Sequence, residues 1–249
     1  MIPLRDSAAP RRLTLVNSAL IAANLAVFIY ELMLGAGAIG FLARFAMIPA
    51  RVSAAAGALG AALTHPSAAA SLEPIAAPLA TILSSIFLHG GVWHIAGNML
   101  YLFIFGAAVE HRMGPRRYLA FYFASGIAAA IATVAMAPAS MVPVIGASGA
   151  IAGVLGAYFI LYPRGRILTV LPIFFYLMKL EIPAAIYLLL WFAVQLYAGI
   201  AAGSHGAIAG GVAWWAHIGG FLFGMLIGPM LARKDPRRRA GQRLSIRGG

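Results

Sequence analysis

Five polar side chains lie in stretches of the sequence that carry no Asp, Glu, Lys or Arg: His89, His94, Asn98, Ser148 and His217. A serine and a histidine within hydrogen-bond reach form a nucleophile and its general base, the pair that acyl transfer requires. Histidine and asparagine side chains also supply donors that stabilise the oxyanion of a tetrahedral intermediate. These residue types therefore predict serine hydrolase chemistry, provided that the fold brings them together.

The uncharged stretches indicate that these side chains are surrounded by a membrane. The stretches cover 74–109, 118–163 and 182–232. Only 10% of the 249 residues are charged, whereas a soluble domain carries about 25%, and 62% are hydrophobic. The second and third stretches are each more than twice as long as one span of about 20 residues, so each should hold two spans and a turn. Polar groups inside such spans are costly and tend to mark function.

The sequence predicts an all-α membrane protein with six spans. An alternative with a seventh span arises because 167–180 is apolar, although it is short and interrupted by Pro172. With six spans and both termini in the cytoplasm, all 18 Lys and Arg residues except Arg44 and Arg51 lie inside. The positive-inside rule therefore favours six spans. We expect them over 13–33, 85–109, 118–136, 147–162, 183–201 and 212–231.

The remaining segments complete the expected organisation. Residues 1–12 form a basic cytoplasmic N-terminus, and the basic tail 232–249 is expected to be disordered. Residues 34–83 are expected to form a long external loop with helical pieces at the membrane interface. The span-bearing domain thus covers 13–231.

The formal charge of +12 does not indicate a nucleic-acid partner. Basic segments beside membrane spans bind anionic lipid, which accounts for the charge. The absence of cysteine excludes disulfides, thiolate metal sites and cysteine nucleophiles. The polar set also lacks the histidine and carboxylate arrangement of a zinc site, so neither a metal nor a cofactor is expected.

Ser148 lies in Gly146-Ala-Ser-Gly149, at the start of the fourth span. A serine at a helix start is ordinarily an N-cap. From Ser148 to Tyr162, however, the predicted helix is only about 22 Å long at 1.5 Å per residue, shorter than the ~30 Å hydrocarbon core. If the inner end is fixed by Arg164 and Arg166, Ser148 lies below the outer membrane surface.

His217 lies about five residues into the sixth span, which runs parallel to the fourth, so it is expected at a depth similar to that of Ser148. Gly153 in the fourth span and Gly220 and Gly224 in the sixth follow a small-xxx-small pattern that lets backbones approach closely. Ser148 and His217 therefore come within reach of each other and form the predicted dyad. A Ser-His-Asp triad is not expected, because four of the six acids lie at the inner face. Glu31 stays open as an orienter, with an interfacial or interhelical hydrogen bond as its alternative role.

His94 and Asn98 are four residues apart in the second span, so they project from one helical face. They are the candidate side-chain donors for an oxyanion, together with the backbone N–H of Ser148 at a helix N-terminus. Hydrogen bonding between helices is the alternative role of both side chains.

Three motifs resemble those of the rhomboid intramembrane serine proteases. They are His89-Gly-Gly-Val-Trp-His94-Ile-Ala-Gly-Asn98, Gly146-Ala-Ser148-Gly149 and Ala216-His217-Ile-Gly-Gly220-Phe-Leu-Phe-Gly224. The resemblance also covers the order and length of the six spans, over 13–231. It implies an endopeptidase that hydrolyses a peptide bond in or beside a substrate transmembrane helix, within single-span or polytopic membrane proteins in the lipid bilayer.

The resemblance also implies roles for individual residues. Ser148 and His217 are the dyad, while His94, Asn98 and the Ser148 amide form the oxyanion hole. Gly146, Gly149 and His89 shape the site, and Glu110-His-Arg112 resembles an inner-face polar cluster. By the same analogy, the long first loop 34–83 is a partly embedded element beside the site, and 202–211 is a mobile cap over it. Separately from the resemblance, the Ala-, Gly- and Arg-rich composition favours a bacterial cytoplasmic membrane.

Two departures from the family's pattern accompany the resemblance. Ala152 replaces an aromatic residue that packs on the catalytic imidazole in some members, so Trp214 or Trp215 is expected to take that role. A Trp-Arg pair of the first loop is missing, and Arg44 or Arg51 is the expected anchor. The rival functions are an inactive rhomboid-like binder, which would usually lack the serine or the histidine, and a transporter, for which the sequence shows no internal repeat.

Overall fold

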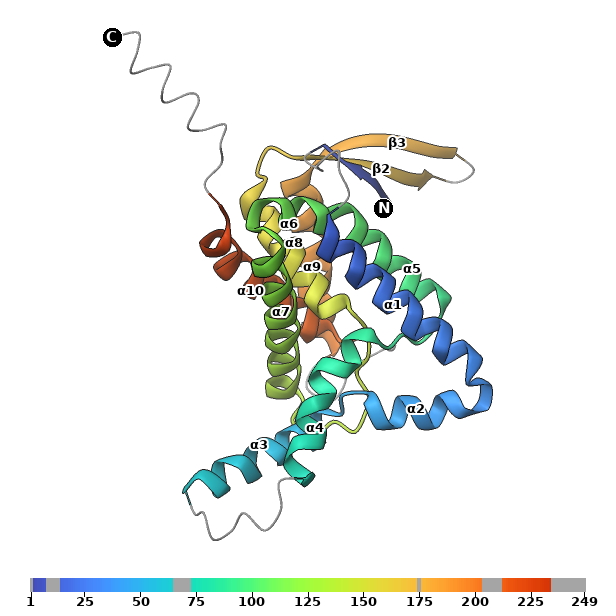
Figure 1. Ribbon diagram of the computed structural model, residues 1–249. Coiled ribbons are helices and arrows are strands. Elements are labelled where there is room, and N and C mark those ends of the chain that lie inside the picture. The colour runs from blue at the N-terminus through green and yellow to red at the C-terminus, as the bar shows by residue number, and fades with distance from the viewer. Residues whose placement is uncertain (1, 8–13, 65–72, 174–175, 203–211, 234–249) are drawn as a thin grey trace, which may run out of the picture.

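The protein is a bundle of helices with a small sheet at one end (Figure 1). The computed structural model describes residues 2–7, 14–64, 73–173, 176–202 and 212–233. Within these ranges, five helices are long and apolar enough to cross a membrane. This confirms the predicted helical membrane bundle. The five are α1 (Leu15–Met33), the helix Val92–Met113, α7 (Pro115–Met136), α9 (Ala184–Ala202) and α10 (Trp214–Leu231).

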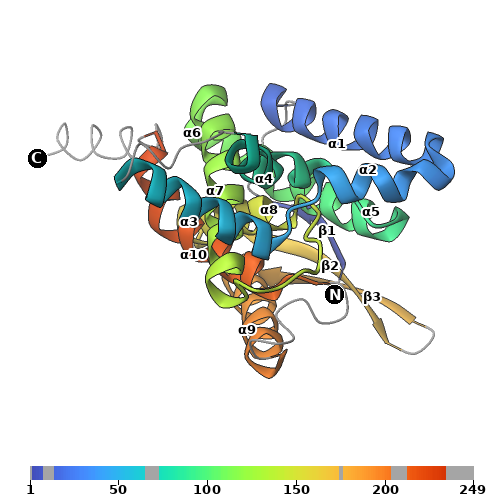
Figure 2. The same cartoon turned by 90° about the horizontal axis from the view of Figure 1, so that it is seen from below.

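The predicted fourth span is the shorter helix α8 (Ser148–Leu161). Its 14 residues correspond to about 21 Å. It is buried from Gly149 to Tyr158 and lies in the middle of the bundle among the longer helices (Figure 2). A helix that is apolar all round belongs in such a position, because it presents no polar face to solvent.

The second span differs from its predicted bounds of 85–109. Residues 73–84 form α4 (Glu73–Ser84), and Ser85–Phe87 form one 3-10 turn. The helical structure is then interrupted at Gly90 and Gly91. The span then comprises α5 (Val92–Tyr101), a π-helical turn Leu102–Gly106 and α6 (Ala107–Met113). The prediction missed the break because Gly-Gly lies inside an uninterrupted apolar stretch. His89 therefore precedes the helix that carries His94 and Asn98.

The π-helical turn is stabilised by two side chains from neighbouring helices. Asn17 on α1 donates from Nδ2 to the Leu102 carbonyl at 3.0 Å and accepts from the Tyr118 hydroxyl at 2.7 Å. A π-turn leaves a carbonyl outside the regular i→i+4 ladder, and a side-chain donor offsets that loss. A Cβ at Gly106 would overlap Asn17, so glycine permits this close approach.

The segment between the first two spans contains three α-helices in its described part: α2 (Ala38–Phe45), α3 (Pro49–Thr64) and α4. It is attached to the bundle by backbone hydrogen bonds between Met47 and Val144, at 3.1 and 2.7 Å. The Ser84 hydroxyl also donates to the Phe45 carbonyl at 2.7 Å. Arg44 and Arg51, the predicted anchors of this segment, take no part in these contacts. Arg44 lies over the ring of its neighbour Phe45, and Arg51 is exposed.

A three-stranded antiparallel sheet, which the sequence analysis does not predict, covers the end of the bundle opposite Ser148. Its order is β1 (Ile2–Asp6), β2 (Arg166–Ile173) and β3 (Tyr176–Pro183). The ambiguous segment 167–180 is therefore a hairpin and not a span, in keeping with Pro172, which cannot continue a helix. The Tyr158 hydroxyl donates to the Asp6 carboxylate and so joins the sheet to α8.

Candidate active site

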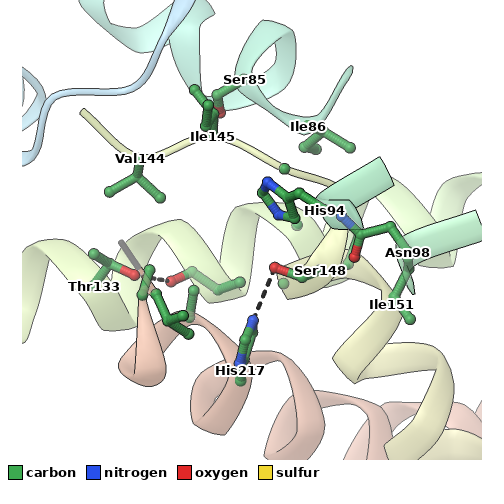
Figure 3. A pocket seen from close by; sticks show the side chains of 18 of the residues that line it. Ser85, Ile86, His94, Asn98, Thr133, Val144, Ile145, Ser148, Ile151 and His217 are labelled. Atoms are coloured by element: carbon green, nitrogen blue, oxygen red, sulfur yellow. Dashed lines mark hydrogen bonds between the residues drawn. The ribbon is translucent and has the colours of Figure 1, made fainter. Parts of the chain in front are cut away.

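Ser148 and His217 lie at the N-terminal ends of two adjacent helices, α8 and α10. The Ser148 hydroxyl and Nε2 of His217 are 2.8 Å apart (Figure 3). Ser148 is the first residue of α8 and His217 the fourth of α10, and both side chains are half-buried. The distance is that of a hydrogen bond between a hydroxyl and an imidazole that acts as its base.

Glycines bring α8 and α10 into direct backbone contact. A Cβ at Gly220 would overlap the Gly149 carbonyl oxygen, and a Cβ at Gly224 would overlap that of Gly153. From the first contact to the second, both helices advance by four residues in the same direction, so they run parallel. The small-xxx-small pattern predicts this close approach. This close packing sets the separation of the serine and the imidazole.

The second ring nitrogen of His217 contacts Gln195, a buried residue on α9. The distance from His217 Nδ1 to Gln195 Oε1 is 2.7 Å. Trp191, also on α9, lies with its ring centroid 5.8 Å from that of His217, and Trp214 lies edge-on at 6.3 Å. Trp214 was one of the two aromatic residues expected beside the imidazole, whereas Trp191 was not anticipated.

Glu31 accepts a hydrogen bond elsewhere. Both of its carboxylate oxygens lie 3.4 Å from the backbone N–H of His89. The carboxylate thus binds the segment that leads into α5. Glu31 on α1 therefore makes a hydrogen bond to the non-helical segment before α5, and the contact to His217 is made by Gln195.

The tautomer of His94 follows from its backbone partner. The N–H of Gly90 donates to Nδ1 of His94 at 3.3 Å, so Nδ1 must be the unprotonated nitrogen. A neutral imidazole then carries its proton on Nε2. This nitrogen faces the Gly146 backbone, because a Cβ at Gly146 would lie 2.8 Å from it. His94 therefore presents an N–H beside Ser148.

Asn98 presents a second donor from the same face of α5. Its side chain is buried, and Nδ2 has no hydrogen-bond partner among the described residues. Such a buried unpaired donor is rare and costs stability. Figure 3 shows Asn98 and His94 on one side of Ser148 and His217 on the other. Two donors facing the serine opposite the base suit a developing oxyanion.

Gly146 shapes the loop before the serine. Its φ is +118°, in a region that residues with a Cβ rarely adopt. Its backbone N–H donates to the Ser85 carbonyl at 2.9 Å, which ties this loop to the turn before α5. The loop and the donors of α5 are thereby held in a fixed relation.

His89 contacts His94 but not the serine. The two rings meet edge-on with centroids 5.2 Å apart, and His89 Nδ1 donates to the Phe87 carbonyl at 3.2 Å. His89 thus supports the ring of His94 from outside the helix. The sequence placed it near these residues, although in a helix that begins only at Val92.

A cavity of about 710 Å³ surrounds the site. It extends from the dyad to Met47 and Ile82 of the segment before α5. Its volume is within the range of pockets that hold small molecules or peptide segments. The predicted cap, 202–211, lies outside the described residues, apart from Ala202 at the end of α9. Among the residues described, no three His, Asp or Glu side chains lie together as a set that could hold a metal ion.

Gln195 is a polar contact of the site that was not predicted from the sequence, as Trp191 is an aromatic one. A signal was present: Gln195 is an amide within an uncharged apolar span, and polar groups in such spans tend to mark function. Its distance of 22 positions from His217 gave no indication that the two would meet. Periodicity relates residues within one helix and not between two helices.

The sequence of this helical membrane bundle matches the model of a known protein family. The Rhomboid domain matches residues 76–234, which is more than half of the chain. The chain therefore belongs to the rhomboid family, and it is an integral multi-pass membrane protein.

Curated relatives carry the same family name. Rhomboid protein 1, mitochondrial, of Saccharomyces cerevisiae is 29% identical over 165 residues, which cover 64% of this chain and 44% of that protein. The rhomboid protease GluP of Bacillus subtilis is 46% identical over 76 residues, covering 30% and 14% respectively. The presenilin-associated rhomboid-like protein of Bos taurus mitochondria is 32% identical over 96 residues, covering 37% and 26%. This chain thus matches less than half the length of each of these relatives.

Proposed function

We propose that the protein is an intramembrane serine endopeptidase that cleaves a peptide bond in or beside a transmembrane helix of a membrane protein substrate. The observation that carries the proposal is the 2.8 Å contact between the Ser148 hydroxyl and His217 Nε2. Membership of a family whose relatives include the rhomboid protease of Bacillus subtilis supports it. Ser148 is proposed as the nucleophile and His217 as the general base and acid.

The proposed reaction proceeds in two halves. His217 Nε2 takes the proton of the Ser148 hydroxyl while the serine oxygen attacks the scissile carbonyl carbon. The negative charge that forms on the carbonyl oxygen is stabilised by His94 Nε2–H, Asn98 Nδ2 and the Ser148 backbone N–H. His217 then protonates the leaving amine, and in the second half it activates the water that hydrolyses the acyl-enzyme.

The depth of the site determines the kind of substrate. At about 21 Å, α8 is shorter than the ~30 Å hydrocarbon core. We propose that its C-terminal end and the sheet face the cytoplasm, as the distribution of basic residues indicates. Ser148 would then lie below the outer surface and be reached by water through the cavity. A substrate helix must unwind locally to present its carbonyl, which favours helices with Gly, Pro or polar residues near the cut.

The proposal is tested by cleavage of a single-span substrate in liposomes. Ser148→Ala and His217→Ala should each lower kcat by at least about 10³-fold, because a dyad loses its function with either member. Ser125→Ala is the matched control: Ser125 is a buried serine on α7 whose hydroxyl donates to its own helix at Phe121. Its kcat should equal that of the parent.

A fluorophosphonate probe tests the nucleophile without a substrate helix. The folded parent should be labelled at Ser148, and the Ser125→Ala variant should be labelled equally. If the parent neither cleaves the substrate nor reacts with the probe, the protease function is excluded, and an inactive binder of membrane helices becomes the better explanation.

A further inference from the structure

Gln195 is a buried amide on α9, a helix that exposes apolar side chains on its outward face. Ile186, Leu189, Leu190 and Val194 are all at least half exposed, whereas Gln195 is 6% exposed. An amide in such a position is costly unless both its donor and its acceptor are paired. Both groups of Gln195 have partners, and these partners determine what the amide does.

The orientation of the amide is set by the backbone of its own helix. Gln195 Nε2 donates to the Trp191 carbonyl one turn earlier, at 3.2 Å. A carbonyl only accepts hydrogen bonds, so the NH₂ group must face Trp191. The Oε1 atom is therefore the one directed at His217, where it lies 2.7 Å from Nδ1.

An amide oxygen also only accepts, so His217 Nδ1 must carry the proton. A neutral imidazole has one N–H, which leaves Nε2 as a free lone pair. That lone pair faces the Ser148 hydroxyl at 2.8 Å. These hydrogen bonds have one consistent direction: the Ser148 hydroxyl donates to His217, His217 donates to Gln195, and Gln195 donates to the Trp191 carbonyl. His217 is thus held in the tautomer that a general base requires.

We propose that Gln195 is a positioning residue of the dyad: its Oε1 fixes the tautomer and ring orientation of His217. It occupies the place that a carboxylate occupies in a Ser-His-Asp triad, but as a neutral acceptor. When His217 takes the serine proton, the Nδ1–H bond to Oε1 remains and no buried carboxylate has to be accommodated. This inference rests on the proposed function, and it adds a third residue to the proposed dyad.

Three substitutions separate the hydrogen bond from the volume of the side chain. Gln195→Met is of similar length but has no oxygen acceptor, so kcat should fall about 10- to 10²-fold while KM stays within about twofold. The rate of fluorophosphonate labelling should fall by the same factor. Gln195→Glu keeps an acceptor oxygen at the same reach and should recover most of the kcat lost in the Met variant. Gln195→Asn is too short to bind Trp191 and His217 together and should resemble the Met variant, which keeps the inference testable if the Met variant does not fold.

Tyr187→Phe is the matched control on the same helix. It removes the 2.6 Å hydrogen bond between the Tyr187 and Tyr101 hydroxyls, which joins α9 to α5 and does not involve His217. Its kcat and labelling rate should equal those of the parent. If it loses as much kcat as Gln195→Met, Gln195 only anchors α9 and the inference is overturned.

The inference is also overturned if a folded Gln195→Met or Gln195→Asn variant has the same kcat and labelling rate as the parent. The proposed function is tested separately by Ser148→Ala. Loss of cleavage in Ser148→Ala, together with full activity in the Gln195 variants, would leave the protease function standing and remove only the role of Gln195.

Discussion

A Cβ built on Gly146 would lie 2.8 Å from Nε2 of His94, so the loop before Ser148 and the first proposed oxyanion donor are in contact. We predict that Gly146→Ala lowers kcat by about tenfold or more. The added methyl both displaces His94 and places a Cβ at a φ of +118°, which costs of order 1 to 2 kcal/mol.

Gly35→Ala separates these two effects. Gly35 also has a positive φ, of +51°, but a Cβ there meets nothing within 4 Å. Its variant should show normal kcat with a slightly lower midpoint of thermal unfolding. Equal loss of kcat in both variants would mean that backbone strain, and not the contact with His94, governs the effect at Gly146.

Asn98 offers a prediction in which activity and stability change differently. Asn98→Leu should lower kcat by about 10² to 10³-fold, the usual cost of removing one oxyanion donor. The midpoint of thermal unfolding should be unchanged or higher, because Nδ2 is buried without a partner among the described residues and its removal relieves a desolvation cost. Differential scanning fluorimetry in detergent and cleavage kinetics measure the two quantities. A large loss of stability would show that Asn98 serves the fold instead.

The sequence predicted the spans because each leaves a local signal. Charges, Gly and Pro end the apolar stretches close to the observed helix bounds, as for α7, α9 and α10. The sheet was missed because β1 lies in a short basic terminus and pairs with β2 across more than 150 positions. That pairing has no local periodicity.

The candidate site shows the same division between local and non-local information. His94 and Asn98 share a face by helical spacing alone, and the glycine pattern indicates that α8 and α10 approach closely. Gln195 and Trp191 reach His217 from a third helix, α9, whose rotation depends on packing. No pattern within one helix specifies that rotation.

The glycine contact between α8 and α10 predicts a loss of stability. Gly224→Ala places a methyl group where the Gly153 carbonyl oxygen lies. Because this contact is backbone against backbone, neither side can move by a rotamer change, and we expect destabilisation by about 1 to 3 kcal/mol. Gly57→Ala on α3, where a Cβ meets nothing within 4 Å, should leave the unfolding midpoint unchanged or raise it.

The contact between the sheet and α8 predicts that the end of the helix far from Ser148 also supports the fold. Tyr158 is fully buried and donates its hydroxyl to the Asp6 carboxylate. Tyr158→Phe removes that donor from a buried acceptor, so we expect the free energy of unfolding to fall by about 1 to 3 kcal/mol. The kcat per folded molecule should remain close to that of the parent, because Tyr158 lies almost three helical turns from Ser148.

Tyr197→Phe is the control for this experiment. Tyr197 is 76% exposed on α9, and its variant should match the parent in both stability and kcat. Active-site titration with a fluorophosphonate gives the folded fraction, so stability and turnover are measured on the same sample. A Tyr158→Phe variant with the parent's unfolding midpoint would show that this hydroxyl contributes nothing to the stability of the contact between the sheet and α8.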